Sequence, residues 1–255
     1  MTTRPTVLVS GANSGIGKII VSRLARAGYD VAINYKVDPV AADNLASELK
    51  NQGARAVAIY ADVANSKDVA AMFEEIFSSF GRLDALVNNA GVQVWKPLLE
   101  VQESEWDRVI ETNLKGCFLC TQGAARHMSE RGGGRIINIG SGCNKVAFPN
   151  LVDYTASKGG VLALSRELGV QFAREGIRVN ALSPGPVATP LLMELFAKDP
   201  ERAARRLVHV PIGRFAEPEE IAAAVAFLAS DDASFVTAST FLVDGGLTAA
   251  YVTPL

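Results

Sequence analysis

Residues 6–18, TVLVSGANSGIGK, decide how this chain folds. The apolar run Thr6–Val9 predicts a buried β-strand, and residues 17–27 predict an amphipathic helix soon after it. The glycines between them let the backbone turn sharply, and the start of the helix offers N–H groups and a positive dipole end to an anion. The spacing is G-x-x-x-G-x-G, without the Gly-Lys-Ser/Thr ending of a nucleoside-triphosphate loop. The segment therefore predicts a turn that binds the pyrophosphate of a dinucleotide.

Strand-like and helix-like segments alternate along the rest of the chain. Further strands are predicted at residues 30–34, 56–60, 85–88, 135–139, 178–182 and 240–243, and further helices at 40–51, 66–80, 103–130, 154–174 and 218–229. Most of the strand runs are apolar throughout, which is typical of parallel strands covered on both faces. The pattern predicts the α/β class: one domain over residues 1–255, built on a doubly wound parallel sheet of about seven strands with helices on both faces.

Composition excludes several other classes of protein. Hydrophobic residues make up 49% of the 255 residues and the net charge is −2, so a large core is expected and neither nucleic acid nor a membrane is an expected partner. Residues 1–5 are too short for a signal peptide, and no apolar stretch approaches the ~20 residues that span a bilayer. Cys117 and Cys120 have C-x-x-C spacing but no histidine cluster nearby, so they are interpreted as buried thiols and no metal site is expected. We expect a soluble cytoplasmic protein.

A tyrosine and a lysine share one helix face in the predicted helix 154–174. Tyr154 and Lys158 are four residues apart, so their phenol and ammonium can reach the same small volume. A free tyrosine has a pKa of about 10, and a nearby cation favours its phenolate. The Y-x-x-x-K pattern alone is weak. It becomes strong here because Ser141 precedes Tyr154 by thirteen residues and the glycine-rich turn lies upstream. The combination predicts a nicotinamide-dependent oxidoreductase.

The end of the second predicted strand addresses the choice between NAD and NADP. A carboxylate there would favour NAD by binding the ribose 2′-hydroxyl. The chain has Asn34, Tyr35 and Lys36 instead, and the lysine can pair with a 2′-phosphate. Asp38 weakens this argument if its loop folds back, and Lys36 has the alternative interpretation of a solvated loop charge. We expect NADP, with NAD as the other possible cofactor.

These motifs taken jointly resemble the short-chain dehydrogenase/reductase family, in its classical subgroup. The matching residues are Ser10–Gly17, Asp62, Asn88–Gly91, Asn113, Ser141, Tyr154–Lys158, Pro184, Gly185 and Thr189. They span nearly the whole chain in the family's order and spacing. The resemblance implies a Rossmann-type fold and an enzyme that interconverts a carbonyl and a secondary alcohol by hydride transfer.

The resemblance also implies a role for each site residue. Tyr154 would be the general acid/base, Lys158 would lower its pKa and hold the nicotinamide ribose, Ser141 would bind the substrate oxygen, and Asn113 would support a water-mediated proton relay. The expected cofactor-binding residues are Gly11, Asn13, Ser14, Gly15, Ile16, Gly17, Asn34, Tyr35, Lys36, Asp62, Val63, Asn89, Ala90, Gly91, Tyr154, Lys158, Pro184, Gly185, Val187 and Thr189. Ser14 stands where NADP-preferring members often carry a basic residue, so use of both cofactors stays open.

The sequence specifies the substrate-binding part of the site less closely than the cofactor-binding part. Expected pocket residues are Trp95, Cys143, Asn144, Phe148, Leu192 and Phe196, with a substrate lid within residues 188–217. Four lid cations, Lys198, Arg202, Arg205 and Arg206, either steer an anionic substrate or carrier protein or form a solvated face. The region from Val210 to Gly246 resembles both 3-oxoacyl-carrier-protein reductases and sugar 1-dehydrogenases, and does not choose between them.

Two alternative functions belong to other classes of protein. A catalytically silent dinucleotide-binding sensor is one alternative, although such sensors often lose the tyrosine or lysine retained here. A serine hydrolase is disfavoured, because Ser141 is not within G-x-S-x-G and has no plausible histidine partner. The resemblance further implies a homotetramer, with one interface on residues 113–125 and 154–172 and another on residues 240–255. The expected partner is otherwise a small carbonyl or alcohol substrate.

Overall fold

The computed structural model describes residues 4–250, in which seven strands form one sheet in the order β3-β2-β1-β4-β5-β6-β7. The strands are β1 (Thr6–Val9), β2 (Asp30–Tyr35), β3 (Ala56–Tyr60), β4 (Ala85–Asn88), β5 (Gly134–Ile139), β6 (Ile177–Pro184) and β7 (Thr240–Val243). Every neighbouring pair is parallel. The strand order reverses direction between β1 and β4, and ligands of such sheets bind beyond the carboxyl ends of the strands at this point. The predicted doubly wound α/β fold is confirmed.

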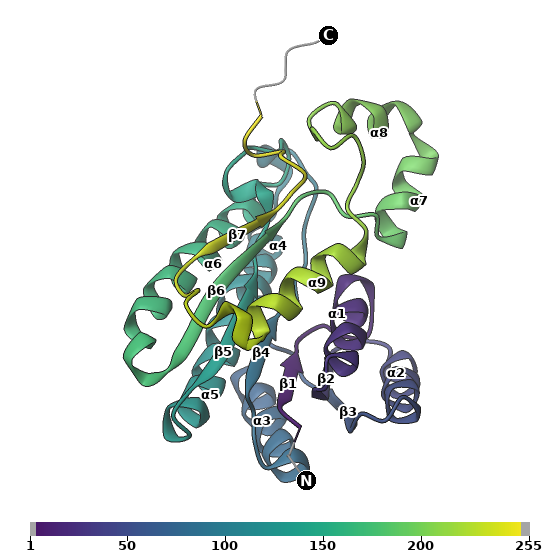
Figure 1. Cartoon of the computed structure of the whole chain (residues 1–255). Coiled ribbons are helices and arrows are strands. Elements are labelled where there is room, and N and C mark those ends of the chain that lie inside the picture. The colour runs from purple at the N-terminus through teal and green to yellow at the C-terminus, as the bar shows by residue number, and fades with distance from the viewer. Residues whose placement is uncertain (1–3, 251–255) are drawn as a thin grey trace.

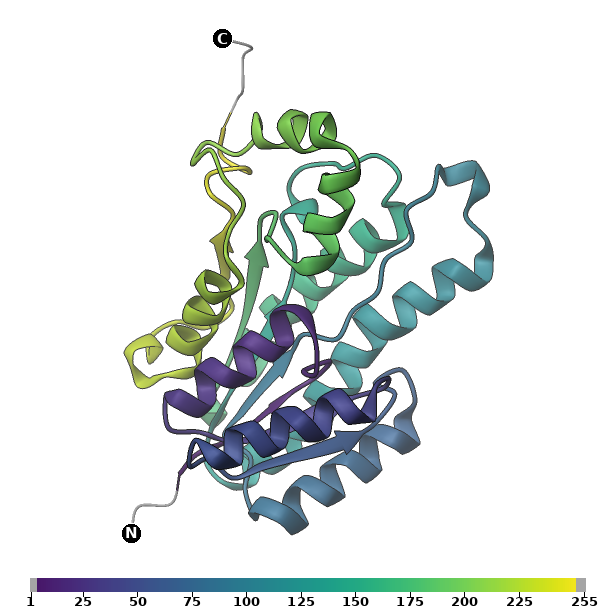
Figure 2. The same cartoon turned by 90° about the vertical axis from the view of Figure 1, so that its right-hand side faces the viewer.

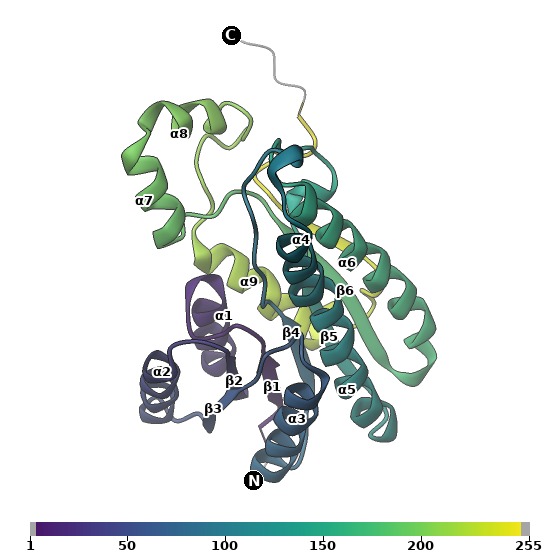
Figure 3. The same cartoon turned by 180° about the vertical axis from the view of Figure 1, so that it is seen from behind.

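Helices cover both faces of the sheet. One face carries α1 (Gly15–Arg26), α2 (Pro39–Asn51) and α9 (Pro218–Ala229), while the other carries α3 (Ser66–Phe80), α4 (Glu103–Ile110), α5 (Gly116–Glu130) and α6 (Val152–Gln171) (Figures 1 and 3). Each face has its own apolar cluster. Ile20, Leu24 and Val225 belong to the first, and Met72 and Met128 to the second. The sheet is therefore buried on both sides, which is why its strands are almost continuously apolar.

The structure differs from the prediction in two helical regions. The single helix expected over 103–130 contains a π-helical turn, Glu111–Lys115, between α4 and α5. The stretch between β6 and α9 holds two helices, α7 (Pro190–Lys198) and α8 (Pro200–Leu207), which lie beyond the carboxyl end of the sheet (Figures 1 and 2). No helix within residues 4–250 has the length and apolar character needed to cross a membrane.

The two ends of this helical insertion are held together. Val187 and Ala216 form an isolated parallel bridge. The backbone N–H of Ala188 donates to the carbonyl of Ala216 at 2.8 Å, and the N–H of Ala216 donates to the carbonyl of Pro186 at 2.9 Å. The chain therefore leaves the main body and returns to it at one point.

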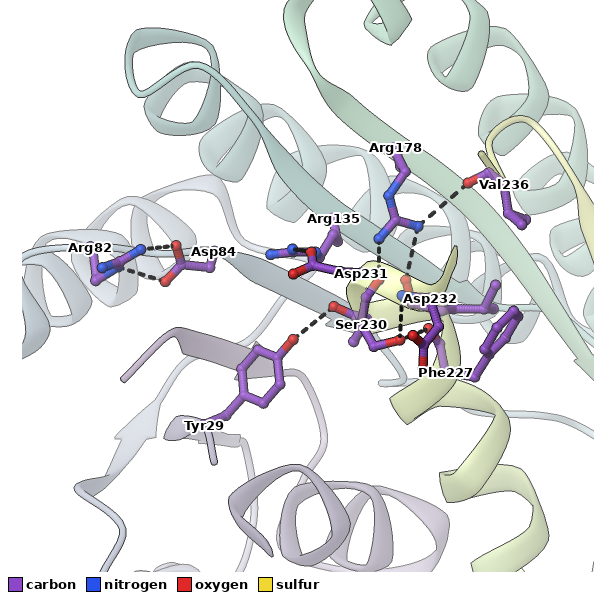
Figure 4. Close-up of polar contacts among 12 residues, drawn as sticks. Tyr29, Arg82, Asp84, Arg135, Arg178, Phe227, Ser230, Asp231, Asp232 and Val236 are labelled. Atoms are coloured by element: carbon purple, nitrogen blue, oxygen red, sulfur yellow. Dashed lines mark hydrogen bonds and ion pairs between the residues drawn. The ribbon is translucent and has the colours of Figure 1, made fainter. Parts of the chain in front are cut away.

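The C-terminal end of α9 is tied to β6 and to the segment before β2. Arg178 donates to the carbonyls of Leu228 at 3.1 Å and Ser230 at 2.8 Å, and the hydroxyl of Tyr29 donates to the carbonyl of Ala229 at 2.7 Å (Figure 4). The last carbonyls of a helix lack partners within the helix, and a guanidinium supplies both hydrogen bonds and a favourable charge there. These contacts fix α9 against the sheet.

Candidate active site

The glycine-rich turn after β1 needs its glycines for two reasons, backbone conformation and close packing. Gly11 and Gly15 have φ values of 59° and 52°, in the left-handed region. A Cβ atom on Gly17 would lie 2.3 Å from the carbonyl oxygen of Gly11 and 2.6 Å from Nδ2 of Asn89. The turn therefore leaves its backbone, and the N-terminus of α1, available to an anion at the carboxyl end of the sheet.

Ser10 and Asn89 lock this turn to the segment that follows β4. The Oγ atom of Ser10 accepts from the backbone N–H groups of Asn89 and Ala90, both at 3.0 Å. The amide of Asn89 donates to the carbonyls of Ser10 and Gly11, both at 3.0 Å. Two of the predicted cofactor segments are thereby held against each other.

Asn34, at the end of β2, supports the turn from within the protein. Its Oδ1 atom accepts from the backbone N–H of Gly11 at 3.1 Å, and its Nδ2 atom donates to the carbonyl of Ala61 at 3.1 Å. The side chain is buried, so its amide links three segments of backbone. Its neighbour Tyr35 packs edge-on against Tyr60, with ring centroids 6.0 Å apart.

Lys36 makes an ion pair with another residue expected at the cofactor. Its Nζ atom lies 2.6 Å from Oδ2 of Asp62. Partial burial acts to raise the pKa of Asp62, but hydrogen bonds from Lys36 and the backbone of Ala64 outweigh it and bring the pKa below its ordinary value. Lys36 is thus held at the end of β3, beside the predicted adenine-binding position, although most of its side chain is exposed.

The side chain of Asp38 caps the helix that follows it. Its carboxylate accepts from the backbone N–H of Ala41 at 3.0 Å and caps α2. The amide of Asn13 donates to the carbonyls of Val37 at 2.7 Å and Asp38 at 3.1 Å, which fixes the loop to the glycine-rich turn. The carboxylate that could have favoured NAD therefore serves a helix terminus.

Ser141, Tyr154 and Lys158 line one cavity of about 1030 Å³ at the carboxyl end of the sheet. Ser141 follows β5, and Tyr154 and Lys158 lie one turn apart on α6. The Nζ atom of Lys158 is 5.7 Å from the centroid of the Tyr154 ring and donates to the carbonyl of Ile139 at 2.6 Å. The structure therefore brings together three of the four predicted catalytic residues around one open volume.

Burial decides the protonation of this pair. It raises the pKa of Tyr154 to about 12, although a hydrogen bond with Ser141 acts in the opposite direction. It lowers the pKa of Lys158 to about 8. The expectation that Lys158 lowers the tyrosine pKa stays a prediction, because Lys158 is not among the groups that shift the pKa of Tyr154 in this structure. Desolvation of the phenol is the larger effect, and the lysine directs its hydrogen bond to Ile139.

Asn113 lies on the π-helical turn, and its side chain is fully used. Its Oδ1 atom accepts from the backbone N–H of Val92 at 2.8 Å, while Nδ2 donates to the Val92 carbonyl at 2.9 Å and to Oγ of Ser157 at 3.0 Å. A small cavity of about 10 Å³ touches both Asn113 and Lys158. That volume is about the size of one water molecule.

The remaining predicted residues divide into those that line the large cavity and those that do not. The lining includes Ile16, Asn89, Gly91, Pro184, Gly185, Val187 and Thr189 from the cofactor set, and Trp95, Cys143, Phe148 and Leu192 from the substrate set. Asn144 instead donates to Oγ of Ser183 at 2.9 Å, and Phe196 stacks on Phe215 with centroids 5.1 Å apart. Val63 is buried beside Gly116.

The motifs did not indicate Arg108 and Leu247, which also line the cavity but belong to no motif.

The fold and this arrangement define an oxidoreductase built on a dinucleotide-binding sheet. A family model described as Enoyl-(Acyl carrier protein) reductase matches residues 11–248. The chain belongs to that family, one of the short-chain dehydrogenases/reductases, which confirms the resemblance read from its motifs.

Individual relatives cover nearly the whole chain. It is 41% identical over 242 residues to the 3-oxoacyl-[acyl-carrier-protein] reductase FabG of Staphylococcus aureus (strain N315), covering 95% of this chain and 97% of the relative. It is 37% identical over 248 residues to glucose 1-dehydrogenase 2 of Bacillus subtilis (strain 168), covering 96% and 95%. A crystal structure of a gluconate 5-dehydrogenase from Burkholderia cenocepacia J2315, in complex with NADP and tartrate, matches with a TM-score of 0.92 and 36% identity over 97% of this chain and 96% of that one.

Proposed function

We propose that this protein interconverts a carbonyl compound and a secondary alcohol with NADP(H), using Tyr154 as general acid/base. The observation that carries the proposal is the convergence of Ser141, Tyr154 and Lys158 on one cavity that also reaches the glycine-rich turn through Ile16. A nicotinamide dinucleotide fits this cradle, because the left-handed backbone at Gly11 and Gly15 turns the chain sharply ahead of α1, whose first N–H groups can bind a pyrophosphate. The bound dinucleotide supplies or accepts the hydride.

The chain's own residues handle the proton. With a pKa of about 12, Tyr154 keeps its proton at neutral pH and can donate it to a carbonyl oxygen as negative charge develops there. The hydroxyl of Ser141 donates to the same oxygen. Lys158, with a pKa of about 8, is mostly protonated at neutral pH and balances the tyrosinate that remains. The small cavity beside Asn113 and Lys158 supports a relay that returns the proton from solvent.

NADP is the proposed cofactor. Lys36 follows β2, where a 2′-phosphate would lie, and its ammonium would exchange the ion pair with Asp62 for that phosphate. The nearby carboxylate of Asp38 is engaged in capping α2. The gluconate 5-dehydrogenase of similar structure contains NADP.

We further propose that residues 188–217 form a lid and that the protein is a homotetramer. The lid proposal rests on α7 and α8, which lie beyond the sheet and contribute Leu192 and Arg206 to the cavity. Exposed apolar side chains occur on both expected interfaces: Phe118 and Val170 on α5 and α6, and Phe241 and Leu242 on β7. The part of the second interface beyond residue 250 lies outside the described residues. A monomer in light scattering at micromolar concentration would contradict the tetramer.

The test of function is the change in absorbance of reduced nicotinamide. NADPH and NADH are offered with ketones, β-keto thioesters and diketones, and both oxidised cofactors with sugars and secondary alcohols. We expect turnover with NADPH, and a loss of at least ~10³-fold in kcat for Tyr154→Phe with cofactor affinity preserved. Tyr60→Phe, at an exposed tyrosine, is the control. Normal turnover by Tyr154→Phe would refute the mechanism.

A sugar 1-dehydrogenase is the second candidate function, favoured by the 37% identity to glucose 1-dehydrogenase 2. Turnover only with a sugar and an oxidised cofactor would select it. Cofactor binding without turnover of any of these compounds would instead favour the silent sensor.

A further inference from the structure

Arg206, on the lid helix α8, lies over two aromatic rings that belong to other segments. Its guanidinium carbon is 5.0 Å from the centroid of Phe148, which precedes α6, and 5.5 Å from the centroid of Trp95, which follows β4. Aromatic ring faces attract a guanidinium within about 6 Å of their centroids. The two rings therefore hold this cation in a defined place over the cavity.

That place is the boundary between two cavities. Arg206, Trp95 and Phe148 line the cavity of about 1030 Å³ that contains Ser141 and Tyr154. The same three residues line a neighbouring cavity of about 420 Å³, to which Arg205 and His209 also contribute. A molecule that binds with its carbonyl at Tyr154 and extends toward the outside would pass Arg206.

The charged side chains described along this path are basic. Among residues 4–250, those lining the two cavities include Arg108, Lys158, Arg205 and Arg206, and no aspartate or glutamate. The positive charge of Arg206 is also felt within the catalytic cavity at Cys143. Burial raises the pKa of this thiol, and the charge of Arg206 acts to lower it. Lys158 is adjacent to Tyr154, Arg108 lines only the catalytic cavity, and Arg205 lines only the neighbouring one. Arg206 lines both, so it is the cation placed to meet a more distant part of the substrate.

We propose that Arg206 is a substrate-recognition residue and that the substrate is an oxo acid or the corresponding hydroxy acid, whose carboxylate Arg206 binds. A guanidinium presents N–H groups along its edges in a planar fork that matches the two oxygens of a carboxylate. This inference rests on the proposed function, since it assigns the substrate class of the same site.

The test compares oxo acids with their neutral methyl esters. Three pairs place the carboxylate at increasing distance from the carbonyl: pyruvate, acetoacetate and levulinate, each against its methyl ester. Equilibrium binding in the presence of NADP⁺ is followed by tryptophan fluorescence in a Trp106→Phe background, in which Trp95 is the only remaining tryptophan. NADPH oxidation is measured separately with the same compounds.

We expect at least one acid to bind about tenfold or more tightly than its ester, as a charge-assisted hydrogen bond would give. Arg206→Gln should remove that preference, and Arg206→Lys should keep part of it. The control is Lys198→Gln, which removes an exposed lid cation that pairs with Glu194 and lines neither cavity. It should keep the full preference.

Two results would overturn the inference: no acid bound more tightly than its ester in any pair, or a preference that survives Arg206→Gln. The kinetic measurement separates this from the proposed function. Arg206-dependent acid binding without oxidation of NADPH by any compound would remove the proposed function and leave the recognition role. Oxidation of NADPH at equal rates with acids and esters, together with equal binding of both, would support the proposed function and remove the recognition role of Arg206.

Discussion

The Nδ2 atom of Asn113 lies 3.0 Å from Oγ of Ser157, and Ser157 donates to the carbonyl of Tyr154 at 2.7 Å. A single buried hydroxyl thus links the π-helical turn to the backbone of the proposed catalytic tyrosine.

Ser157→Ala removes both hydrogen bonds and leaves one N–H of a buried amide without this acceptor. We expect unfolding free energy to fall by about 1–2 kcal/mol, and kcat to fall several-fold with cofactor affinity unchanged. Denaturant unfolding and steady-state kinetics would check this. Ser22→Ala, which removes a helix-surface hydroxyl, is the control, and an equal loss of kcat in both would contradict the linkage.

Gly17→Ala tests the glycine-rich turn. The added Cβ would stand 2.3 Å from a backbone oxygen and 2.6 Å from Asn89, closer than atoms can approach, so the turn must move. We expect cofactor affinity to fall by at least ~10-fold, because the turn and the first N–H groups of α1 are displaced together. Fluorescence titration with NADPH measures it. Arg23→Ala, at an exposed position on the same helix, should bind as the unmodified protein does; normal affinity in Gly17→Ala would mean that the cofactor does not use this turn.

Lys36→Ala tests the cofactor preference. Lys36 is the cation at the end of β2, and its loss should raise the KM for NADPH by about 3–10-fold while changing the KM for NADH by less than twofold. Lys50→Ala, at an exposed lysine near the end of α2, controls for the change in overall charge. An equal effect on both cofactors would show that Lys36 does not contact a 2′-phosphate.

The pKa of Lys158 makes a prediction about pH. The value of about 8 lies below the ordinary 10.5, so the ammonium is present below pH 8 and is lost as the pH rises through that value. The parameter kcat/KM for NADPH reports ionisations of the free enzyme. It should be level below pH 8 and fall about tenfold per unit well above it, since the proposed mechanism requires the cation. Carbonyl reduction measured from pH 6 to pH 10 gives the profile. A profile that stays level to pH 10 would contradict the assigned role.

Arg178→Met tests the attachment of α9. The carbonyls of Leu228 and Ser230 would lose their guanidinium donor at the helix C-terminus. We expect unfolding free energy to fall by about 2 kcal/mol, with kcat unchanged because these contacts involve no residue of the candidate site. Urea unfolding measures the change, and Arg174→Met, at an exposed arginine, is the control. A fall in kcat at full stability would show that α9 influences the site.

The strands could be predicted because both faces of the sheet are covered. β1, β3, β4 and β7 have the predicted bounds, and β2, β5 and β6 extend by one to three residues. The lid helices could not be predicted in the same way. α8 is PERAARRL, a short helix in which leucine is the only large apolar residue, so its sequence lacks the repeated apolar positions that reveal a core-facing helix. The π-helical turn Glu111–Lys115 could not be predicted either, because the helical sequence pattern continues on both sides of it.

The site was predictable where it depends on chain order and not where it depends on packing. Motif spacing placed Ser141, Tyr154 and Lys158 at one cavity. The ion pair between Lys36 and Asp62, the engagement of Asn144 with Ser183 and the stacking of Phe196 on Phe215 join segments that no local pattern relates. The raised pKa of Tyr154 arises from desolvation, which is a property of the assembled fold.

The bridge between Val187 and Ala216 has an evolutionary consequence. Because residues 188–215 depart and return through one pair of neighbouring backbone positions, their length and sequence can change without altering the register of any strand. Mutation can therefore diversify the part of this loop beyond Thr189 as a unit, while the residues of the candidate site outside it are inherited intact. The same arrangement makes the segment a natural unit for grafting, with the junctions at Val187 and Ala216 as the points where a foreign loop would be joined.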